Sequence, residues 1–273
     1  MTFQYLINQW HVAGPSEFLA KNPSRIILLE KALVIFNVDG SWYAFEDRCP
    51  HREFPLSQGK IDQDGQIECP YHGWRFNMAG KLEAIPGLPF GSKLPKCSLK
   101  SISCQEYDGL VWLCLEVNDQ TRPLEDLTPS YRPEDYLFMT CHVKADYINS
   151  FENLLDGFHT PYIHKGLVRG TRSNRVNAKM VRHPNYSEIT YTGEKSQSGF
   201  FSQLFEPDRR KSIGRFIFPN VAQLEYWGTH LHFMLEVFGR PTKIDQTEFT
   251  IRVSTRKGIV SEVNGIMEGC KPP

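Results

Sequence analysis

The sequence contains no hydrophobic run long enough to cross a bilayer. A transmembrane helix needs about 20 consecutive apolar residues, whereas the densest early stretch of this 273-residue chain covers only residues 26–29. The N-terminus, MTFQYLINQWHVAG, also lacks the basic start and long apolar stretch of a secretory signal. We therefore expect a cytoplasmic protein without a transmembrane segment.

An excess of charge of either sign is absent as well. The 31 Lys and Arg residues balance the 31 Asp and Glu residues, which argues against a protein held to nucleic acid or membrane by its overall charge. Hydrophobic residues at 40% and charged residues at 23% are typical of an ordinary globular protein. No Gly-x-Gly-x-x-Gly fingerprint follows a predicted strand. The sequence therefore indicates no nicotinamide- or flavin-binding domain of its own.

The chain has few cysteines, and most of them show no paired spacing along the sequence. Among the seven cysteines, Cys49 and Cys69 are each followed within three residues by a histidine, which a disulfide scaffold explains poorly. The others show no paired spacing, and we interpret them as free thiols in a reducing compartment. They are Cys97, Cys104, Cys114, Cys141 and Cys270.

Strand and turn signals divide the chain in two. Segments 25–38 and 110–117 are rich in β-branched and apolar residues, and Asp39-Gly40 offers a hairpin turn, so we expect an antiparallel β domain over residues 1–118. Residues 119–273 then form an α+β domain with few helices. In this second domain, residues 149–167 have a helical pattern, residues 168–182 are interpreted as a basic solvated loop or an acidic-partner site, and strands are predicted at 187–193, 215–227, 231–239 and 248–256.

Two short motifs in the first domain each combine a cysteine with a histidine. Residues 49–52 read Cys-Pro-His-Arg, and residues 69–74 read Cys-Pro-Tyr-His-Gly-Trp. Two thiolates and two imidazoles suit either a tetrahedral zinc ion or a mixed-ligand [2Fe–2S] centre. A Cys2His2 zinc finger typically offers both cysteines before both histidines, and this chain does not. The prolines stiffen each loop, and Gly73 permits a tight turn of the backbone.

A second pattern occupies residues 152–164, Glu-Asn-Leu-Leu-Asp-Gly-Phe-His-Thr-Pro-Tyr-Ile-His. On a helix, Asp156 and His159 would share one face. Pro161 must kink or restart that helix before His164, which could bring both histidines to one metal. Two histidines and a carboxylate form the facial triad of non-haem iron(II) oxygenases. Taken alone, however, two histidines five residues apart are more often surface or core residues than ligands.

Both motifs resemble those of one family. CPHR and CPYHGWRFNMAGK resemble the cluster-binding motif of Rieske non-haem iron oxygenases, and ENLLDGFHTPYIH is similar to the catalytic motif of their α (terminal oxygenase) subunits. The resemblance extends from about residue 7 to residue 255. It implies cluster ligands Cys49, His51, Cys69 and His72, iron ligands His159 and His164, Asn153 near the iron, and Asp156 as a bridge to His72 of a neighbouring subunit in a homotrimer.

The same resemblance implies a fold and an activity. The fold would be an N-terminal all-β Rieske [2Fe–2S] domain followed by a helix-grip (Bet v1-like) antiparallel-sheet catalytic domain. A flavin reductase, with or without a ferredoxin, would pass electrons from NAD(P)H through the cluster to a mononuclear Fe(II). There O2 would hydroxylate or demethylate an organic substrate, apolar or aromatic in character. In its single-subunit size and its ENLLD-x-x-H spacing, the chain resembles the monooxygenase and O- or N-demethylase branch more than the two-subunit ring dioxygenases.

The C-terminal part departs from the family pattern. The family takes its third iron ligand, an aspartate, from a helix near the C-terminus, whereas this chain ends in TRKGIVSEVNGIMEGCKPP. We assign no third ligand, and three interpretations stay open: a truncated chain, use of Glu262 or Glu268, or weak iron binding. The alternative function is a Rieske electron-transfer protein without a functional mononuclear iron site, and a zinc-stabilised module comes third. The other acidic candidates are Asp208, Asp245 and Glu248.

Several aromatic residues of the second domain are candidates for an apolar substrate cavity, although packing in the core is the simpler interpretation. They are Phe205, Phe216, Phe218 and Trp227. His230 and His232 alternate along a predicted strand, and for both we favour packing over metal binding.

Overall fold

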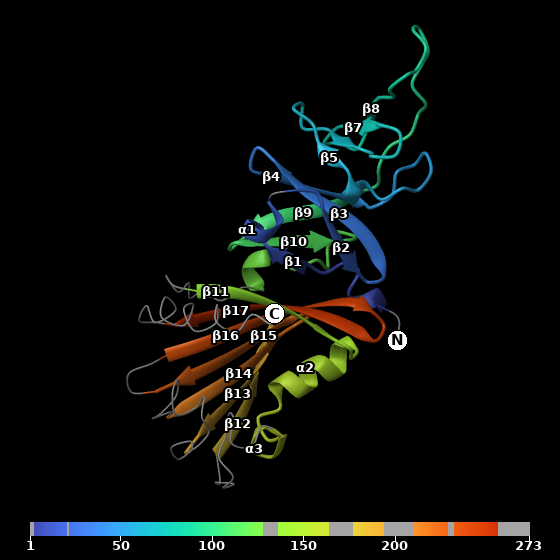
Figure 1. Cartoon of the computed structure of the whole chain (residues 1–273). Coiled ribbons are helices and arrows are strands. Elements are labelled where there is room, and N and C mark those ends of the chain that lie inside the picture. Colours follow the sequence, from blue (N-terminus) through green and yellow to red (C-terminus); the bar gives the residue numbers. More distant parts are fainter. Residues whose placement is uncertain are drawn as a thin grey trace. The chain divides into compact units, whose positions relative to one another are not determined.

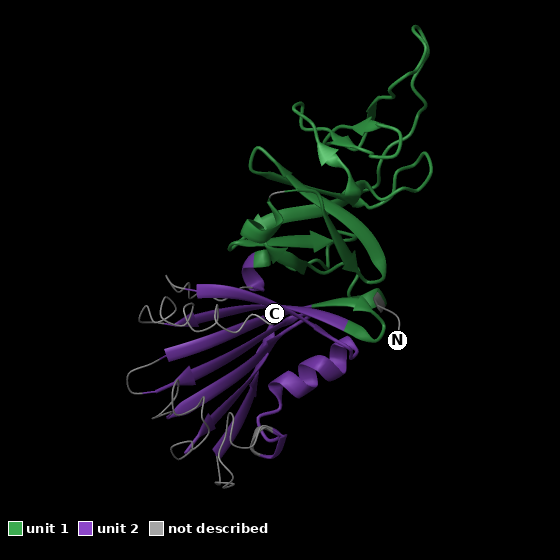
Figure 2. Ribbon diagram, in the orientation of Figure 1, with its two compact units in different colours: residues 1–124, 240–246 green, residues 125–239, 247–273 purple. Residues whose placement is uncertain are grey.

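The computed structural model of the chain describes residues 3–20, 22–127, 136–163, 177–193, 210–228 and 232–255. The chain forms two compact units (Figure 2). Unit 1 contains residues 1–124 and 240–246, and unit 2 contains residues 125–239 and 247–273. Within the described ranges, no helix is long and apolar enough to span a membrane.

Unit 1 is built on a six-stranded antiparallel sheet in the order β1-β10-β9-β4-β3-β2. A smaller four-stranded sheet, β5-β6-β7-β8, follows β4 in the chain. The strands are β1 (His11–Pro15), β2 (Ser24–Leu28), β3 (Lys31–Val38), β4 (Ser41–Glu46), β5 (Lys60–Ile61), β6 (Ile67–Glu68), β7 (Arg75–Phe76), β8 (Leu82–Ala84), β9 (Ser101–Tyr107) and β10 (Leu110–Cys114). Short helices are η1 (Phe3–Tyr5), α1 (Ser16–Leu19), η2 (Leu56–Gln58) and η3 (Leu124–Asp126).

The predicted all-β character of the N-terminal part is confirmed. Asp39 and Gly40 adopt positive φ angles in the predicted hairpin turn between β3 and β4, and all five residues of β10 are buried. The segment 25–38 is not one strand, because Leu29 and Glu30 also take positive φ and turn the chain between β2 and β3. The amide of Leu29 donates to the carbonyl of Pro241 at 2.9 Å.

Unit 2 is a seven-stranded antiparallel sheet with one substantial helix against it (Figure 1), as the predicted helix-grip fold requires. The strand order is β11-β17-β16-β15-β14-β13-β12. The elements are β11 (Tyr136–Val143), α2 (Tyr147–Leu155), α3 (Thr160–Ile163), β12 (Asn177–Arg182), β13 (Tyr186–Thr192), β14 (Lys211–Ile217), β15 (Val221–Trp227), β16 (His232–Lys243) and β17 (Gln246–Thr255).

Residues 177–182 were predicted to belong to a solvated loop, and this prediction is wrong. They form β12, which is the last of the described strands in the sheet order and pairs with β13. Lys179 and Arg182 are exposed on this strand. Charged, exposed side chains are typical of edge strands, where they discourage pairing with other chains. An exposed edge strand of this kind lacks the alternation of apolar and polar residues from which a half-buried strand is predicted.

Helix α2 packs against one face of the sheet, which we call the helix face. Asp146 caps the start of α2 by accepting hydrogen bonds from the amides of Ile148 and Asn149. On the buried side of α2, the ring of Phe151 lies 5.3 Å from that of Phe216 on β14 and 5.4 Å from that of Phe249 on β17. Phe216, a candidate for the substrate cavity, therefore belongs to the core beneath the helix.

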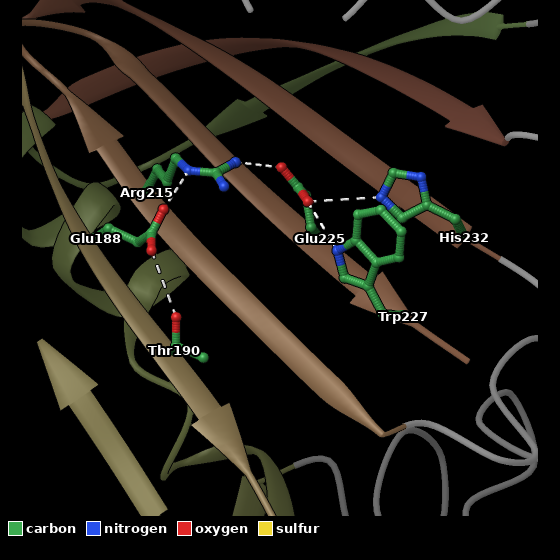
Figure 3. Close-up of polar contacts among 6 residues, drawn as sticks. All are labelled: Glu188, Thr190, Arg215, Glu225, Trp227 and His232. Atoms are coloured by element: carbon green, nitrogen blue, oxygen red, sulfur yellow. Dashed lines mark hydrogen bonds and ion pairs between the residues drawn. The ribbon is translucent and has the colours of Figure 1, made fainter. Parts of the chain in front are cut away.

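The opposite face of the sheet carries a charged cluster on four adjacent strands (Figure 3). Arg215 Nε donates to Glu188 Oε2 at 2.7 Å, and Arg215 Nη1 donates to Glu225 Oε1. Trp227 Nε1 donates to Glu225 Oε2 at 2.9 Å, and His232 Nε2 approaches the same oxygen at 3.5 Å. Trp227 thus packs against a polar network and stacks on His232, with ring centroids 3.8 Å apart.

This cluster gives a pH-dependent contribution to stability. Burial alone raises the pKa of Glu225, but hydrogen bonds from His232 and Arg215, together with the charge of Arg215, outweigh it and lower the pKa to about 2. A carboxylate whose folded pKa lies below its unfolded value stabilises the protein above the unfolded pKa, and this contribution disappears as pH falls through the folded pKa. We expect the difference in unfolding free energy between wild type and Glu225→Gln to be constant above about pH 5 and to shrink between about pH 4.5 and 2. Denaturant unfolding at several pH values measures it, and a constant difference would contradict the assignment.

Candidate metal centres

The two Cys/His motifs fold into loops with the same backbone hydrogen bonds. In the first loop, the amide of Cys49 donates to the carbonyl of Phe54 at 2.9 Å, and the amide of Glu53 donates to the carbonyl of Cys49 at 2.8 Å. In the second, Cys69 pairs in the same way with Trp74 and Gly73, at 2.8 and 2.9 Å. Each loop thus spans the cysteine and the fifth residue after it. The histidine lies between them in both.

The fourth residue after each cysteine has a positive φ angle, 56° at Glu53 and 67° at Gly73. At Gly73 a side chain is excluded by space as well, since a Cβ would lie 2.8 Å from Cγ of Pro86. The positive φ angle and the close contact with Pro86 both explain why glycine follows His72.

The two loops place the cysteines inside and the histidines outside. Cys49 and Cys69 are 1% and 2% exposed and belong to one apolar cluster with residues such as Phe45. His51 and His72 are exposed, and their ring centroids lie 4.7 Å apart. The four predicted ligands therefore form a buried thiol pair and an exposed imidazole pair.

Electrostatics differ between the two pairs. Burial raises the pKa of the Cys49 thiol to about 11, and its hydrogen bond with Cys69 adds to this effect. Desolvation lowers the pKa of His51, and so do the nearby charges of His72 and Arg52. Neutral imidazole, which can ligate a metal, is therefore favoured at His51.

Neighbouring aromatic rings hold the imidazoles in place. His51 stacks on Trp74 with centroids 4.7 Å apart and planes 4° from parallel. His72 lies 3.9 Å from the ring of Tyr71, which in turn packs against Phe54 at 5.4 Å. The residues between and after the ligands thus orient the histidine rings.

This arrangement fits a binuclear cluster better than a single ion. Across the described ranges, no three His, Cys, Asp or Glu side chains come together closely enough to hold one metal ion. A mixed-ligand [2Fe–2S] cluster needs only two protein donors on each iron, cysteines on one and histidines on the other. A structural zinc site needs all four donors around one ion.

The second motif follows the end of α2. The prediction that Asp156 and His159 share one face of a helix is wrong, because α2 ends at Leu155 and Asp156 has extended backbone angles. Asp156 Oδ1 accepts a hydrogen bond from the amide of Phe158 at 2.7 Å. The resulting turn still brings the two side chains together, with Asp156 Oδ2 3.5 Å from His159 Nδ1.

The predicted restart of the helix is present. Helix α3 begins at Thr160, and the carbonyl of His159 accepts hydrogen bonds from the amides of Tyr162 and Ile163. Pro161 thus lies in the first turn of a new helix. Backbone amides there have no partner within the helix, so the missing amide hydrogen of proline costs no hydrogen bond.

The remaining iron-site candidates divide between described and undescribed parts of the chain. His164, the second predicted iron ligand, lies outside the described residues. Glu248 contacts His142 on the neighbouring strand, with Oε2 3.3 Å from Nδ1, and Asn153 is exposed on α2. Asp245 lies at the turn between β16 and β17, within the part of that hairpin that belongs to unit 1. Phe205, Asp208, His230, Glu262, Glu268 and Cys270 also lie outside the described residues.

Tyr191 on β13 is a neighbour of this segment that the motif did not indicate. Its ring lies 5.8 Å from that of Phe158, edge to face. A Cβ added at Gly157 would lie 3.3 Å from the Tyr191 hydroxyl. The segment carrying Asp156 and His159 is therefore supported from the helix face of the sheet.

Comparison with known proteins agrees with the first motif. A family model described as Rieske [2Fe-2S] domain matches residues 9–98. A putative toluene-4-sulfonate monooxygenase system iron-sulfur subunit, TsaM2, of Comamonas testosteroni is 32% identical over 167 residues, which are 58% of this chain and 46% of that protein. Methylxanthine N3-demethylase NdmB of Pseudomonas putida is 30% identical over 179 residues, 60% of this chain and 49% of the relative. Residues 9–98 thus form a Rieske [2Fe–2S] domain, and the chain is homologous to components of Rieske oxygenases.

The fold of this Rieske oxygenase homologue is also found in solved structures. The structure of Pseudomonas putida CBB5 NdmA with caffeine has a TM-score of 0.81 and covers 97% of this chain and 80% of that one, at 20% identity. At that identity the match shows a common fold. The chain spans less than half the length of the curated relatives that it matches.

Proposed function

We propose that this chain is the terminal oxygenase component of a multicomponent system that hydroxylates or demethylates an apolar or aromatic substrate. Residues 1–118 would form the electron-accepting domain and residues 119–273 the catalytic domain. The proposal is carried by the contact between Asp156 and His159 at the end of α2, because an electron carrier requires the cluster domain alone. Relatives named as a demethylase and a monooxygenase component support this activity.

The first domain supplies the cluster site in this proposal. Cys49 and Cys69 would hold the inner iron of a [2Fe–2S] cluster, and His51 and His72 the outer one. When bound, the cluster supplies one-electron transfer, and two neutral imidazoles in place of thiolates raise its potential. The exposed histidines face solvent, where a ferredoxin or a flavin reductase that draws on NAD(P)H can approach.

The second domain supplies the mononuclear site. His159 and His164 would hold Fe(II), which activates O2 when bound, and the third carboxylate is unassigned. The Asp156 carboxylate, 3.5 Å from His159 Nδ1, orients that imidazole and can accept its proton, a common arrangement around metal-bound histidines. In a homotrimer, Asp156 would link His159 to His72 of the partner subunit. Asn153, exposed on the last turns of α2, is a further candidate near the iron.

The test counts iron and acid-labile sulfide per chain after anaerobic reconstitution. We expect about three irons and two sulfides in the wild type, since the cluster accounts for two irons and the second site for one. The double variant His159→Ala/His164→Ala is expected to retain about two irons and two sulfides. His183→Ala, which removes an exposed histidine stacked on Tyr186, is the matched control and should keep three irons.

Each other result of this test would support a different function. Two irons and two sulfides in the wild type would favour the alternative, an electron-transfer protein without a functional mononuclear iron site. A colourless protein containing zinc would indicate a zinc-stabilised binding module instead. Three irons that survive the double variant would show that the second site lies elsewhere.

A further inference from the structure

A buried hydroxyl group on the helix face of the sheet has no hydrogen-bond partner among the described residues. Ser212 lies on β14 and is 5% exposed. Its Oγ makes no hydrogen bond within the part of the chain that the structure describes. A buried hydroxyl left without a partner is unfavourable, so a position of this kind calls for an explanation.

Ser212 lies just past the end of α2. On β14, alternate residues Phe216, Gly214 and Ser212 point to the same face. Phe216 packs against Phe151, in the middle of α2, and the Cβ position of Gly214 faces the Leu155 side chain at the end of α2. Ser212 is one further step along the strand, about 6.6 Å on, where the helix no longer covers the sheet.

The neighbour of Ser212 on the next strand contacts the iron-site segment directly. Tyr191 is paired with Ser212 in the register of β13 and β14. It also packs against Phe158 and lies beside Gly157. The Ser212 hydroxyl is therefore adjacent to the residue that supports the Asp156–His159 segment.

The two rows of the helix face that begin at Ser212 and continue towards α2 carry no charged side chain. On the other side, Arg210 lies two residues before Ser212 and is exposed. The sheet register places it in a row with Tyr191 on one side and Tyr226 and Phe233 on the other. The rings of Tyr226 and Phe233 lie 6.1 Å apart. The next row, towards α2, consists of Met180, Ile189, Gly214, Leu224 and Leu235. Neither of these rows contains a charged side chain, and among the described residues the segment after α2 adds Asp156 and His159.

We propose that Ser212 hydrogen-bonds a neutral oxygen of an aromatic substrate held on the helix face beside the Asp156–His159 segment. This inference rests on the proposed oxygenase function and names its substrate class. The flanking rings suit an aromatic ring, and the Ser212 hydroxyl supplies a polar contact that fixes its orientation. The nearby Asp156 carboxylate disfavours an anionic substrate. Ser212 thus determines specificity by selecting a carbonyl, hydroxyl or ether group.

The test uses two probes of nearly equal shape, 1-indanone and indane, which differ in one carbonyl oxygen. Their dissociation constants are measured by calorimetry with reconstituted wild-type protein and with Ser212→Ala. We expect the preference for 1-indanone over indane to fall about three- to tenfold in Ser212→Ala, as for loss of one hydrogen bond. Ser212→Thr keeps a hydroxyl and should retain the preference. Ser187→Ala, on the same face but four residues from Tyr191 along β13, is the matched control and should also retain it.

Several results would overturn this inference. They are an unchanged preference in Ser212→Ala, no binding of 1-indanone to the wild type, and tighter binding of indane-1-carboxylate than of 1-indanone. Because binding requires neither O2 nor electrons, these results are independent of turnover. Three irons per chain together with an unchanged preference would reject the role of Ser212 alone. Two irons per chain would reject the oxygenase.

Discussion

A Cys69→Ala variant is expected to bind no [2Fe–2S] cluster. The Cys69 thiol is 2% exposed and lies beside that of Cys49 in the apolar cluster of unit 1. Removing it leaves one iron with a single protein thiolate, and no other described cysteine belongs to either ligand loop. Iron and sulfide per chain should fall by about two each, and the visible absorption of the cluster should disappear.

Cys104→Ala is the matched control for this experiment. Cys104 lies on β9 of the same unit, and burial raises the pKa of its thiol to about 12, so it is an inert thiol at neutral pH. This variant should keep its iron, sulfide and absorption. A Cys69→Ala protein with full cluster content would show that the predicted ligand set is wrong.

We expect the second largest effect, on stability and cluster content, from Gly59→Ala, which adds a single methyl group. A Cβ at Gly59 would lie 2.0 Å from the carbonyl oxygen of Glu68, whereas real Cβ contacts are almost never under 3.0 Å. Glu68 directly precedes Cys69, and its strand β6 pairs with β5 immediately after Gly59. Gly59→Ala must therefore push β6 away by about 1 Å or more. We expect a loss of unfolding free energy of about 3 kcal/mol and reduced cluster content.

Gly87→Ala separates this clash from a general cost of replacing glycine. Gly87 has a φ of 75° but nothing within 4 Å of its Cβ position. Its replacement should cost about 1–2 kcal/mol for the left-handed backbone and leave the cluster content unchanged. Denaturant unfolding and iron analysis of both variants measure the two effects. If the two variants lost the same unfolding free energy and kept the same cluster content, β6 would accommodate the added methyl group without displacing Cys69.

The cluster motif could be recognised from sequence because its geometry is local. Each loop closes through hydrogen bonds between a cysteine and residues four and five positions later, so the spacing carries the structure. The strands with strong apolar character, such as β10, were predicted for a similar reason. Strand β12 was missed, because an exposed edge strand has no apolar alternation to reveal it.

The second site shows where local patterns were insufficient. The spacing of Asp156 and His159 suggested a common helix face, yet the Asp156 carboxylate accepts the amide hydrogen of Phe158 and so competes with helix continuation. The two side chains meet through a turn instead. Sequence spacing thus indicated that these two side chains lie close together, but it gave the wrong backbone conformation between them.

The sequence by itself determined the loop conformation around each cysteine and the α+β class, since these depend on neighbours within a few residues. Only the tertiary structure decided which groups are buried, which face of the sheet α2 covers, and that Ser212 lies beyond its end next to Tyr191. It also decided that Arg215 joins Glu188 to Glu225. These relations depend on strand register between distant segments, and register is set by packing of whole faces.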